Sequence, residues 1–199
     1  LRHYFTSSQK ATKDSLYLDA LVGLRKTFAT NVNASEIEYA IAKFYFEEGN
    51  KYDQEQSSKY RWNYKKAHCI ALAAINETYG GTQCKLLVDQ IEQRALKLQV
   101  EKVYLPSTKI LYRIDAKNID SLHFKLIRFP NSFERDLEFE GKSTDDYMKT
   151  LYKRNATRTG TKQLENPKDF REHSFEFTTK KLEKGKYVLV VSTERNFNS

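Results

Sequence analysis

Residues 84–106 read CKLLVDQIEQRALKLQVEKVYLP, and the spacing of apolar residues changes within this stretch. Up to Leu98 the apolar residues recur every three or four positions, as on one face of an α-helix: Val88, Ile91, Ala95 and Leu98. From Val100 to Tyr104 the period becomes two, with Val100, Lys102 and Tyr104 on one side and Glu101 and Val103 on the other, as along a β-strand. The stretch therefore predicts a helix that ends near Leu98 and a strand, Val100 to Tyr104, that follows it directly.

Apolar residues at helical spacing also fill the chain before this stretch. They predict one helix from Leu16 to Phe28 and a second from Ile37 to Tyr45, which Asn33 or Ser35 caps and Gly49-Asn50 ends. Residues 1–98 are therefore expected to form an all-α domain of helical hairpins, similar in kind to tetratricopeptide repeats.

A third helix is predicted from Tyr60 to Ile75, with apolar residues on two sides. The second of these stripes contains Trp62, Cys69, Leu72 and Ala73. A helix that is apolar on two sides is expected to be an inner one. Gly80-Gly81 is expected to end this helix, and Thr82 to cap a fourth.

The second half of the chain has the two-residue period of strands. Tyr112, Ile114 and Ala116 point one way, while Arg113 and Asp115 belong to a polar face that we expect to be wet. Further strands are predicted around residues 122–126, 137–139, 159–164, 174–177 and 187–191, with a short helix at 145–153 that Thr144 caps. Short strands without helical crossovers favour an antiparallel β-sandwich of immunoglobulin or fibronectin-III type over residues 99–199. The predicted fold class is thus α+β in two segregated parts.

Composition and charge exclude several classes of protein. The 199 residues carry a net charge of +8, and the basic excess is spread over both halves, as +3 in residues 1–98 and +5 in residues 99–199. No basic run is longer than two residues, so no nucleic-acid partner is predicted. No stretch approaches the roughly 18 apolar residues of a membrane span, so no direct membrane insertion is expected.

The residue types that carry chemistry do not form a recognisable motif. The histidines His3, His68, His123 and His173 are scattered, without the helical spacing of paired metal ligands. No nucleophile elbow, phosphate-binding loop or dinucleotide fingerprint occurs. We therefore predict no catalytic, cofactor-binding or metal-binding residue, and a protein that is not an enzyme.

The two cysteines are expected to remain free. In a hairpin that turns at Gly80-Gly81, Cys69 and Cys84 are offset along the helix axis by roughly 12 Å. A disulfide requires Cα atoms within about 7 Å of each other. We expect two free thiols, at least one of them buried as apolar packing.

Aromatic residues are concentrated in the middle of the helical half. They form a candidate interaction surface, since aromatic side chains are favoured where proteins bind peptides. Packing within the helical core is the alternative explanation for the same residues. The candidate surface comprises Tyr39, Tyr45, Tyr52, Tyr60, Trp62 and Tyr64.

Several stretches in a fixed order resemble a known family. They are Cys84–Leu87, Gln90–Gln93, Leu96–Pro106 and Arg113–Asn118, followed by His173–Phe177 and Leu182–Ser192. Together they are similar to the N-terminal part of bacterial alpha-2-macroglobulin-like proteins, particularly the Bacteroidetes type, with an early macroglobulin-like domain. The resemblance covers about residues 60–199, whereas residues 1–59 resemble only generic helical repeats.

The resemblance implies a role without chemistry of its own. Members of the family trap proteases with a cleavable bait segment and, in many cases, a thioester formed from Cys-x-Glu-Gln. Here Cys69 is followed by Ile-Ala-Leu and Cys84 by Lys-Leu-Leu, so neither thiol matches that motif. The implied role is a non-catalytic scaffold segment of a large protease inhibitor.

The resemblance also implies partners and a location. The partners would be further domains of the same long chain and, through the full-length protein, target proteases. The location would be the periplasm or outer cell envelope, with a lipid anchor upstream of residue 1 as one arrangement. The alternative is a free-standing module that binds a protein or a glycan through its helical-repeat and immunoglobulin-like parts.

Overall fold

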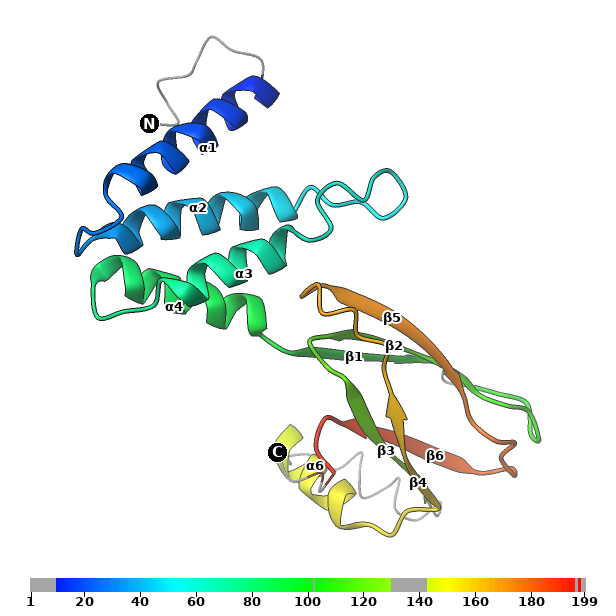
Figure 1. Ribbon diagram of the computed structural model, residues 1–199. Coiled ribbons are helices and arrows are strands. Elements are labelled where there is room, and N and C mark those ends of the chain that lie inside the picture. The colour runs from blue at the N-terminus through cyan, green and yellow to red at the C-terminus, as the bar shows by residue number, and fades with distance from the viewer. Residues whose placement is uncertain (1–9, 102, 130–142, 196, 198–199) are drawn as a thin grey trace. The chain divides into compact units, whose positions relative to one another are not determined.

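The computed structural model describes residues 10–101, 103–129, 143–195 and 197 (Figure 1). Helices come first and strands follow, so the predicted α+β order is confirmed. The helices are α1 (Lys10–Thr27), α2 (Ala34–Gly49), α3 (Asn63–Ala73), α4 (Tyr79–Glu92) and α6 (Thr144–Lys153). The strands are β1 (Ala95–Val100), β2 (Leu111–Lys117), β3 (Ser121–Phe129), β4 (Arg158–Gln163), β5 (Glu172–Thr178) and β6 (Lys186–Ser192).

The chain divides into two compact units. Among the described residues, the helical unit comprises 10–93 together with 168–171, and the sheet unit comprises the rest. The first division falls between Gln93 and Arg94, where the sequence predicts one between residues 98 and 99. The segment 168–171, which lies between β4 and β5 in the sequence, was expected in the sandwich but belongs to the helical unit.

The core of the helical unit lies among α2, α3 and α4. It is built from small residues, Ala42, Ala67 and Ala71, together with larger aliphatic ones from α4, including Leu87 and Ile91. Alanine lets neighbouring helices approach closely, and the branched side chains of α4 fill the space between them. α1 packs on the other side of α2, where the ring centroids of Tyr17 and Phe44 lie 6.1 Å apart.

The prediction that α3 is apolar on two buried sides is wrong. Ala67 and Ala71 of the first stripe are fully buried, but the second stripe is exposed, with Leu72 at 52%. α3 therefore packs against neighbours on one side, and its second apolar stripe faces outward.

Gly80 and Gly81 do not end α3, which stops at Ala73. They lie in the first turn of α4, whose N-cap is Thr78 and not Thr82; the Thr78 hydroxyl accepts a hydrogen bond from the Gly81 N–H. A Cβ atom at Gly80 would collide with the backbone of α2 at Ser35 and Glu36. Gly80 is therefore required by the close approach of α4 to the start of α2, and Gly81 by the close approach of Asn76 in the connection before α4.

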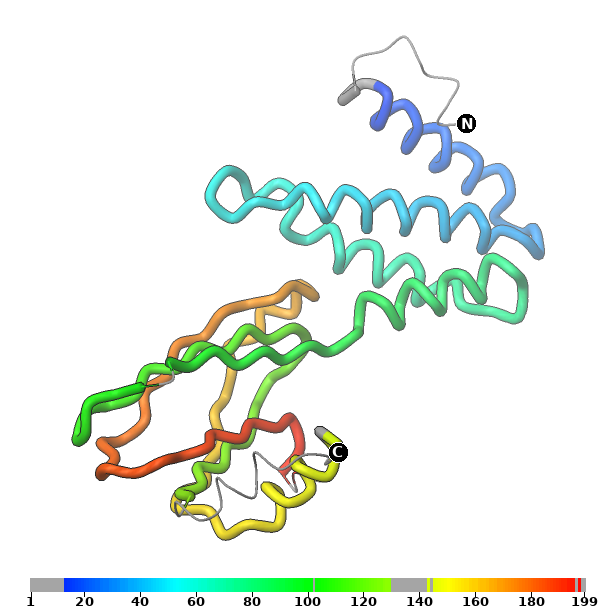
Figure 2. The backbone as a smooth tube through the Cα atoms, turned by 180° about the vertical axis from the view of Figure 1, so that it is seen from behind, coloured from blue at the N-terminus to red at the C-terminus, as the bar shows by residue number. Residues whose placement is uncertain are grey.

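The predicted continuation of α4 to Leu98 is also wrong. α4 ends at Glu92, and Ala95–Val100 forms β1, which replaces the predicted strand Val100–Tyr104 (Figure 2). Leu96 and Leu98 pack against the core of the sheet unit. Ile91, Ala95 and Leu98 fit the spacing of a helix, but Leu96 and Leu98 also fit the alternation of a strand. Hydrogen bonding with β2 favours the strand.

The sheet unit contains two antiparallel three-stranded sheets. Their strand orders are β1-β2-β5 and β4-β3-β6. In the first sheet Ile114 lies opposite Leu98 and Phe175, and in the second Phe124 lies opposite Gly160 and Val191. The predicted strand at 137–139 lies outside the described residues.

One apolar cluster receives side chains from both sheets. Its buried members include Tyr112, Ile114 and Ala116 of β2, which confirms the predicted inward face of that strand, and Leu122 of β3. Phe175 from the first sheet and Leu189 from the second pack against it, among others.

α6 covers the other face of the second sheet. Leu151 of α6 is buried with Ile127 and Phe129 of β3 and Val190 of β6. The N-cap of α6 is Ser143, whose hydroxyl accepts a hydrogen bond from the Asp146 N–H, and not Thr144 as predicted. β3 and β6 are thus apolar on both faces.

The polar face of β2 is not wet throughout. Asp115 is only 4% exposed, and its carboxylate accepts hydrogen bonds from Arg113 Nε at 2.8 Å, Ser174 Oγ at 2.6 Å and Gln99 Nε2 at 3.2 Å. The bonds from Ser174 and Arg113 hold the pKa of Asp115 below its ordinary value. Asp115 thus ties β1, β2 and β5 together across the outer face of their sheet.

We expect Asp115 to make the sheet unit sensitive to acid. Because its pKa is lower in the folded state, its contribution to the free energy of unfolding is present above the unfolded pKa of about 3.9 and is lost as the pH falls through the folded pKa. Asp115→Asn should lower the stability at neutral pH but reduce the further loss between about pH 5 and pH 2. Denaturant unfolding at a series of pH values measures this, with the exposed Asp89→Asn as the control. An unchanged acid dependence in Asp115→Asn would contradict the assignment.

The cysteines are free as predicted, with Cys69 exposed and Cys84 buried. Burial, with Glu38 nearby, raises the pKa of Cys84 to about 11, so its thiol is protonated at neutral pH. A thiol-specific reagent should therefore modify Cys69 rapidly in the native protein and Cys84 only after denaturation. Mass spectrometry of Cys69→Ser and Cys84→Ser variants separates the two sites. Rapid native labelling of both cysteines would show that the α2–α4 core is open.

Candidate functional site

The six aromatic residues predicted as an interaction surface do not share one face. Tyr39 and Tyr45 lie on α2, Tyr52, Tyr60 and Trp62 lie in the connection between α2 and α3, and Tyr64 lies in the first turn of α3. Trp62 is 42% exposed, whereas the five tyrosines are half-buried. The structure places Tyr52 and Tyr64 in an internal cluster, and Tyr45 and Trp62 at a hollow that faces solvent. Tyr39 packs against the helical core, and Tyr60 contributes its backbone carbonyl to the internal cluster.

The internal cluster forms around Arg171. Its guanidinium carbon lies 4.3 Å from the ring centroid of Tyr52 and 4.4 Å from that of Tyr64. Nη2 donates to the carbonyl oxygens of Gly49 and Tyr60, both at 2.9 Å, and Nε donates to that of Arg61 at 3.1 Å. The guanidinium group therefore satisfies carbonyl groups at the end of α2 and in the connection that follows it.

The neighbours of Arg171 in sequence are also bound within the helical unit. Asp169 is 1% exposed and lies 3.5 Å from Nε of Arg61, and it accepts the Arg171 N–H at 3.1 Å. Phe170 stacks on the ring of His68, with centroids 4.6 Å apart. Tyr52 and Tyr64 are thus occupied by this segment. Sequence reasoning missed Arg171, because nothing near residue 171 indicates a partner more than a hundred positions earlier.

The solvent-facing hollow lies beside α2 and α3. It has a volume of about 470 Å³ and is lined by Tyr45, Trp62, Lys65, Lys66, Cys69 and Ile70. Lys66 Nζ lies 5.5 Å from the centroid of Tyr45, and Lys65 Nζ lies 5.6 Å from that of Trp62. The hollow therefore combines exposed aromatic faces with a basic border, a composition suited to a protein segment that carries apolar and acidic side chains.

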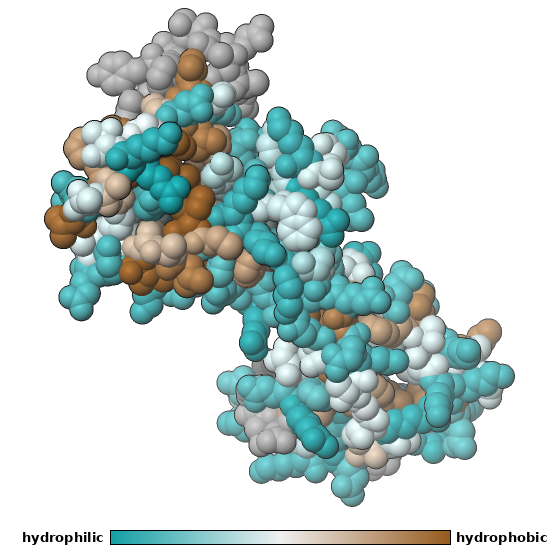
Figure 3. All heavy atoms as spheres, in the orientation of Figure 1, coloured by the Kyte–Doolittle hydropathy of each residue, from teal (hydrophilic) through white to brown (hydrophobic). Residues whose placement is uncertain are grey.

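Hydrophobic side chains also reach the surface elsewhere on the helical unit, and in the view of Figure 3 they gather over part of it. The large apolar residues that are exposed there include Leu16, Val22, Phe28, Val32, Leu72, Ile75, Tyr79 and Leu86. Patches of this kind commonly mark surfaces that contact other proteins.

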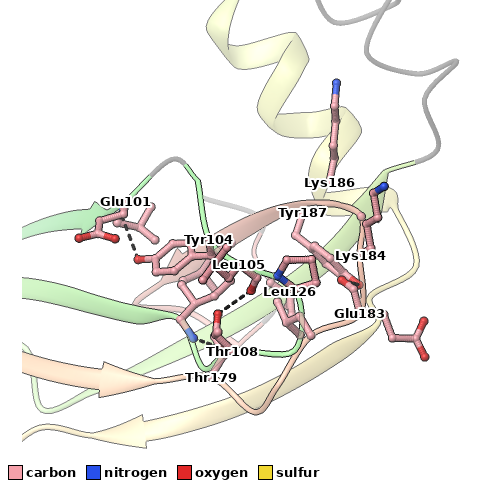
Figure 4. A pocket seen from close by; sticks show the side chains of 16 residues that line it. Glu101, Tyr104, Leu105, Thr108, Leu126, Thr179, Glu183, Lys184, Lys186 and Tyr187 are labelled. Atoms are coloured by element: carbon pink, nitrogen blue, oxygen red, sulfur yellow. Dashed lines mark hydrogen bonds between the residues drawn. The ribbon is translucent and has the colours of Figure 1, made fainter.

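The sheet unit has a larger hollow of its own, with a volume of about 680 Å³ (Figure 4). Two loops form it, one between β1 and β2 and the other between β5 and β6. Ser107 N–H donates to the Leu182 carbonyl at 3.0 Å, and Ile110 N–H donates to the Thr179 hydroxyl at 3.1 Å. No local pattern in the sequence indicates this hollow, because Ile110 and Thr179 of its two walls are 69 positions apart.

The ionisable residues of the described chain do not gather into a metal centre. Among the described residues, no group of three or more His, Cys, Asp or Glu side chains is placed to hold a metal ion. His68 Nε2 lies 2.6 Å from Glu92 Oε1, and the ring also stacks on Phe170, so both contacts position this histidine within the helical unit.

None of the described helices combines the length and the hydrophobicity that a membrane span requires.

Comparison with known proteins finds no matching protein family, no matching curated protein and no matching solved structure.

We expect Arg171 to contribute strongly to the stability of the helical unit. Arg171→Ala removes three hydrogen bonds from a cation and leaves buried carbonyl groups without their donor, so the free energy of unfolding should fall by about 2–4 kcal/mol. Thermal and denaturant unfolding, followed by helical circular dichroism, measure this. The exposed Arg94→Ala is the matched control and should change stability by less than about 0.5 kcal/mol. Equal stability of the two variants would refute a role for the guanidinium group.

Proposed function

We propose that this chain is a non-catalytic scaffold segment of a large alpha-2-macroglobulin-like protease inhibitor of the bacterial cell envelope. Its partners would be further domains of the same long chain and, through the complete protein, target proteases. In this proposal the sheet unit is a macroglobulin-like β-sandwich of immunoglobulin type and the helices are tetratricopeptide-like hairpins.

One observation carries the proposal. The stretches that resemble the family include Leu96–Val100, Arg113–Lys117 and His173–Phe177, and these pair as neighbours β1, β2 and β5 of one sheet. β1 and β2 follow each other in the sequence, whereas β5 begins at Glu172, long after β2 ends at Lys117. The resemblance thus includes segments that only the fold brings side by side, as expected if they belong to one domain.

The sandwich part of the proposal has its own support. Two antiparallel sheets contribute to a single apolar cluster, which is how the inner faces of a sandwich pack. α6 lies on the opposite face of β3 and β6, so it leaves that shared cluster undisturbed.

A second candidate function is a free-standing module that binds a protein or a glycan. The hollow beside α2 and α3 favours it, because Trp62 and Tyr45 present aromatic surface next to Lys65 and Lys66. Aromatic residues with adjacent cations are common at protein interfaces. The two functions differ in the size of the natural polypeptide.

Antibodies raised against this chain test the proposal in the organism that encodes it. An immunoblot of cell fractions should detect a polypeptide several-fold heavier than 23.4 kDa in the periplasmic or outer-envelope fraction. When that polypeptide is purified and mixed with a broad-specificity protease, it should protect a large protein substrate from cleavage. The chain of 199 residues alone, at the same molar ratio, should not protect it.

Two outcomes would contradict the scaffold function. A natural polypeptide with a mass close to 23.4 kDa on the immunoblot would favour the free-standing module. Inhibition by the 199-residue chain alone, or an adduct with the protease that survives denaturant, would require a self-sufficient inhibitor instead.

A further inference from the structure

A second hollow of the sheet unit lies between the two sheets and has a volume of about 390 Å³. Tyr112 of β2 and Thr178 of β5 come from one sheet, and Phe124 of β3, Arg158 of β4 and Leu189 of β6 come from the other. It adjoins the hollow of Figure 4, since Leu126, Thr179 and Leu189 line both. Both volumes lie within the size range of small-molecule sites.

The charges on the 390 Å³ hollow have one sign. Its described lining includes the cationic Arg158, Lys162 and Lys180 and contains no acidic residue. Thr159, Thr178 and Thr179 add hydroxyl groups beside these cations. The larger hollow next to it carries both signs, with Glu101 and Glu183 against Lys184 and Lys186. An anionic group is therefore favoured in the smaller hollow, and an uncharged chain is favoured where the two meet.

Arg158 lines the 390 Å³ hollow, and its guanidinium group makes few hydrogen bonds within the protein. Its Nη2 donates to the Lys181 carbonyl at the long distance of 3.5 Å, while Nη1 is buried and has no hydrogen-bond partner among the described residues. The guanidinium group thus has one long hydrogen bond among the described residues, and a carboxylate in the hollow that Arg158 lines is the partner whose geometry fits it best. Lys162 is held nearby, with Nζ 5.3 Å from the ring centroid of Phe177.

The wall of the hollow is fixed on the side of β4. Gly160 lies directly against the ring of Phe124, so that a Cβ atom at position 160 would come within 2.5 Å of that ring. The absence of a side chain at Gly160 thus lets the Phe124 ring pack directly against β4 beside the hollow. Leu126 and Leu189 then continue the apolar surface into the larger hollow.

We propose that the space between the two sheets binds a medium-chain fatty acid, with its carboxylate on Arg158 and its alkyl chain along Leu126 and Leu189 toward the larger hollow. Lys162 and Lys180 add electrostatic attraction for the carboxylate. This inference goes beyond the scaffold function and does not depend on it.

Titration calorimetry with laurate, kept below its micelle concentration, tests the proposal on the whole chain. Laurate should bind with a stoichiometry of one, and methyl laurate and acetate should each bind at least about tenfold more weakly, because the first lacks the charge and the second lacks the chain. Arg158→Gln should weaken laurate binding by about tenfold or more, with little effect on methyl laurate. The exposed Arg94→Gln, an identical change outside the hollow, should leave both affinities unchanged.

The comparison among ligands uses the unaltered protein, so it remains decisive even if Arg158→Gln disturbs folding, which circular dichroism would reveal. Absence of laurate binding to the folded protein would overturn the proposal. Equal affinity for laurate and methyl laurate would reduce the site to an apolar hollow without an anion site and would overturn it as well. An equal effect of Arg158→Gln and Arg94→Gln would show that only the net charge matters and would overturn the placement of the carboxylate on Arg158.

Discussion

The hydrogen bonds of Arg171 are the contact on which the irregular part of the helical unit depends. The connection between α2 and α3 is thirteen residues long and contains no helix or strand with which to pair its backbone. Arg171 supplies donors to three of the carbonyl groups at its ends, and Tyr52 and Tyr64 enclose the cation between their rings. Arginine suits this place because its planar group offers several donors in fixed directions and remains charged when partly buried.

This contact also determines what the neighbouring aromatic residues can do. Because Tyr52 and Tyr64 hold Arg171, they are not free to bind another molecule, whereas Trp62 and Tyr45 border an open hollow. The aromatic residues of α2, α3 and their connection thus divide into those that pack internally and those that are open to a partner, and composition alone does not separate the two groups. Packing and recognition use the same types of side chain. Contact with the buried guanidinium group of Arg171 distinguishes the aromatic residues that pack from those that border the hollow.

The sheet unit shows a similar division between closed and open surfaces. The apolar cluster around Ile114 and Leu122 closes the middle of the space between the sheets, and α6 covers the outer face of β3 and β6. Towards β4 and the loops that flank β5 and β6, the sheets leave two adjoining hollows with basic residues on their walls. A scaffold domain requires only the closed part. The open part is the reason to expect a ligand as well, because close-packed interiors rarely leave spaces of this size without use.

The sequence by itself determined the first two helices, the extended conformation of β2 and which face of β2 is buried. Apolar residues have helical spacing from Leu16 to Tyr45 and alternate with polar ones from Tyr112 to Ala116. These elements are buried on one side only, and burial on one side produces a periodic pattern within the segment itself. Only the tertiary structure decided that Ala95 and Leu98 belong to a strand, that Leu72 is exposed, and that Gly80 lies against the start of α2. It alone also brought Arg171 to Tyr52 and placed Arg158 beside a hollow between the sheets. The physical reason is that periodicity reports that a side chain is buried but not the partner that buries it, and these partners are distant in the chain.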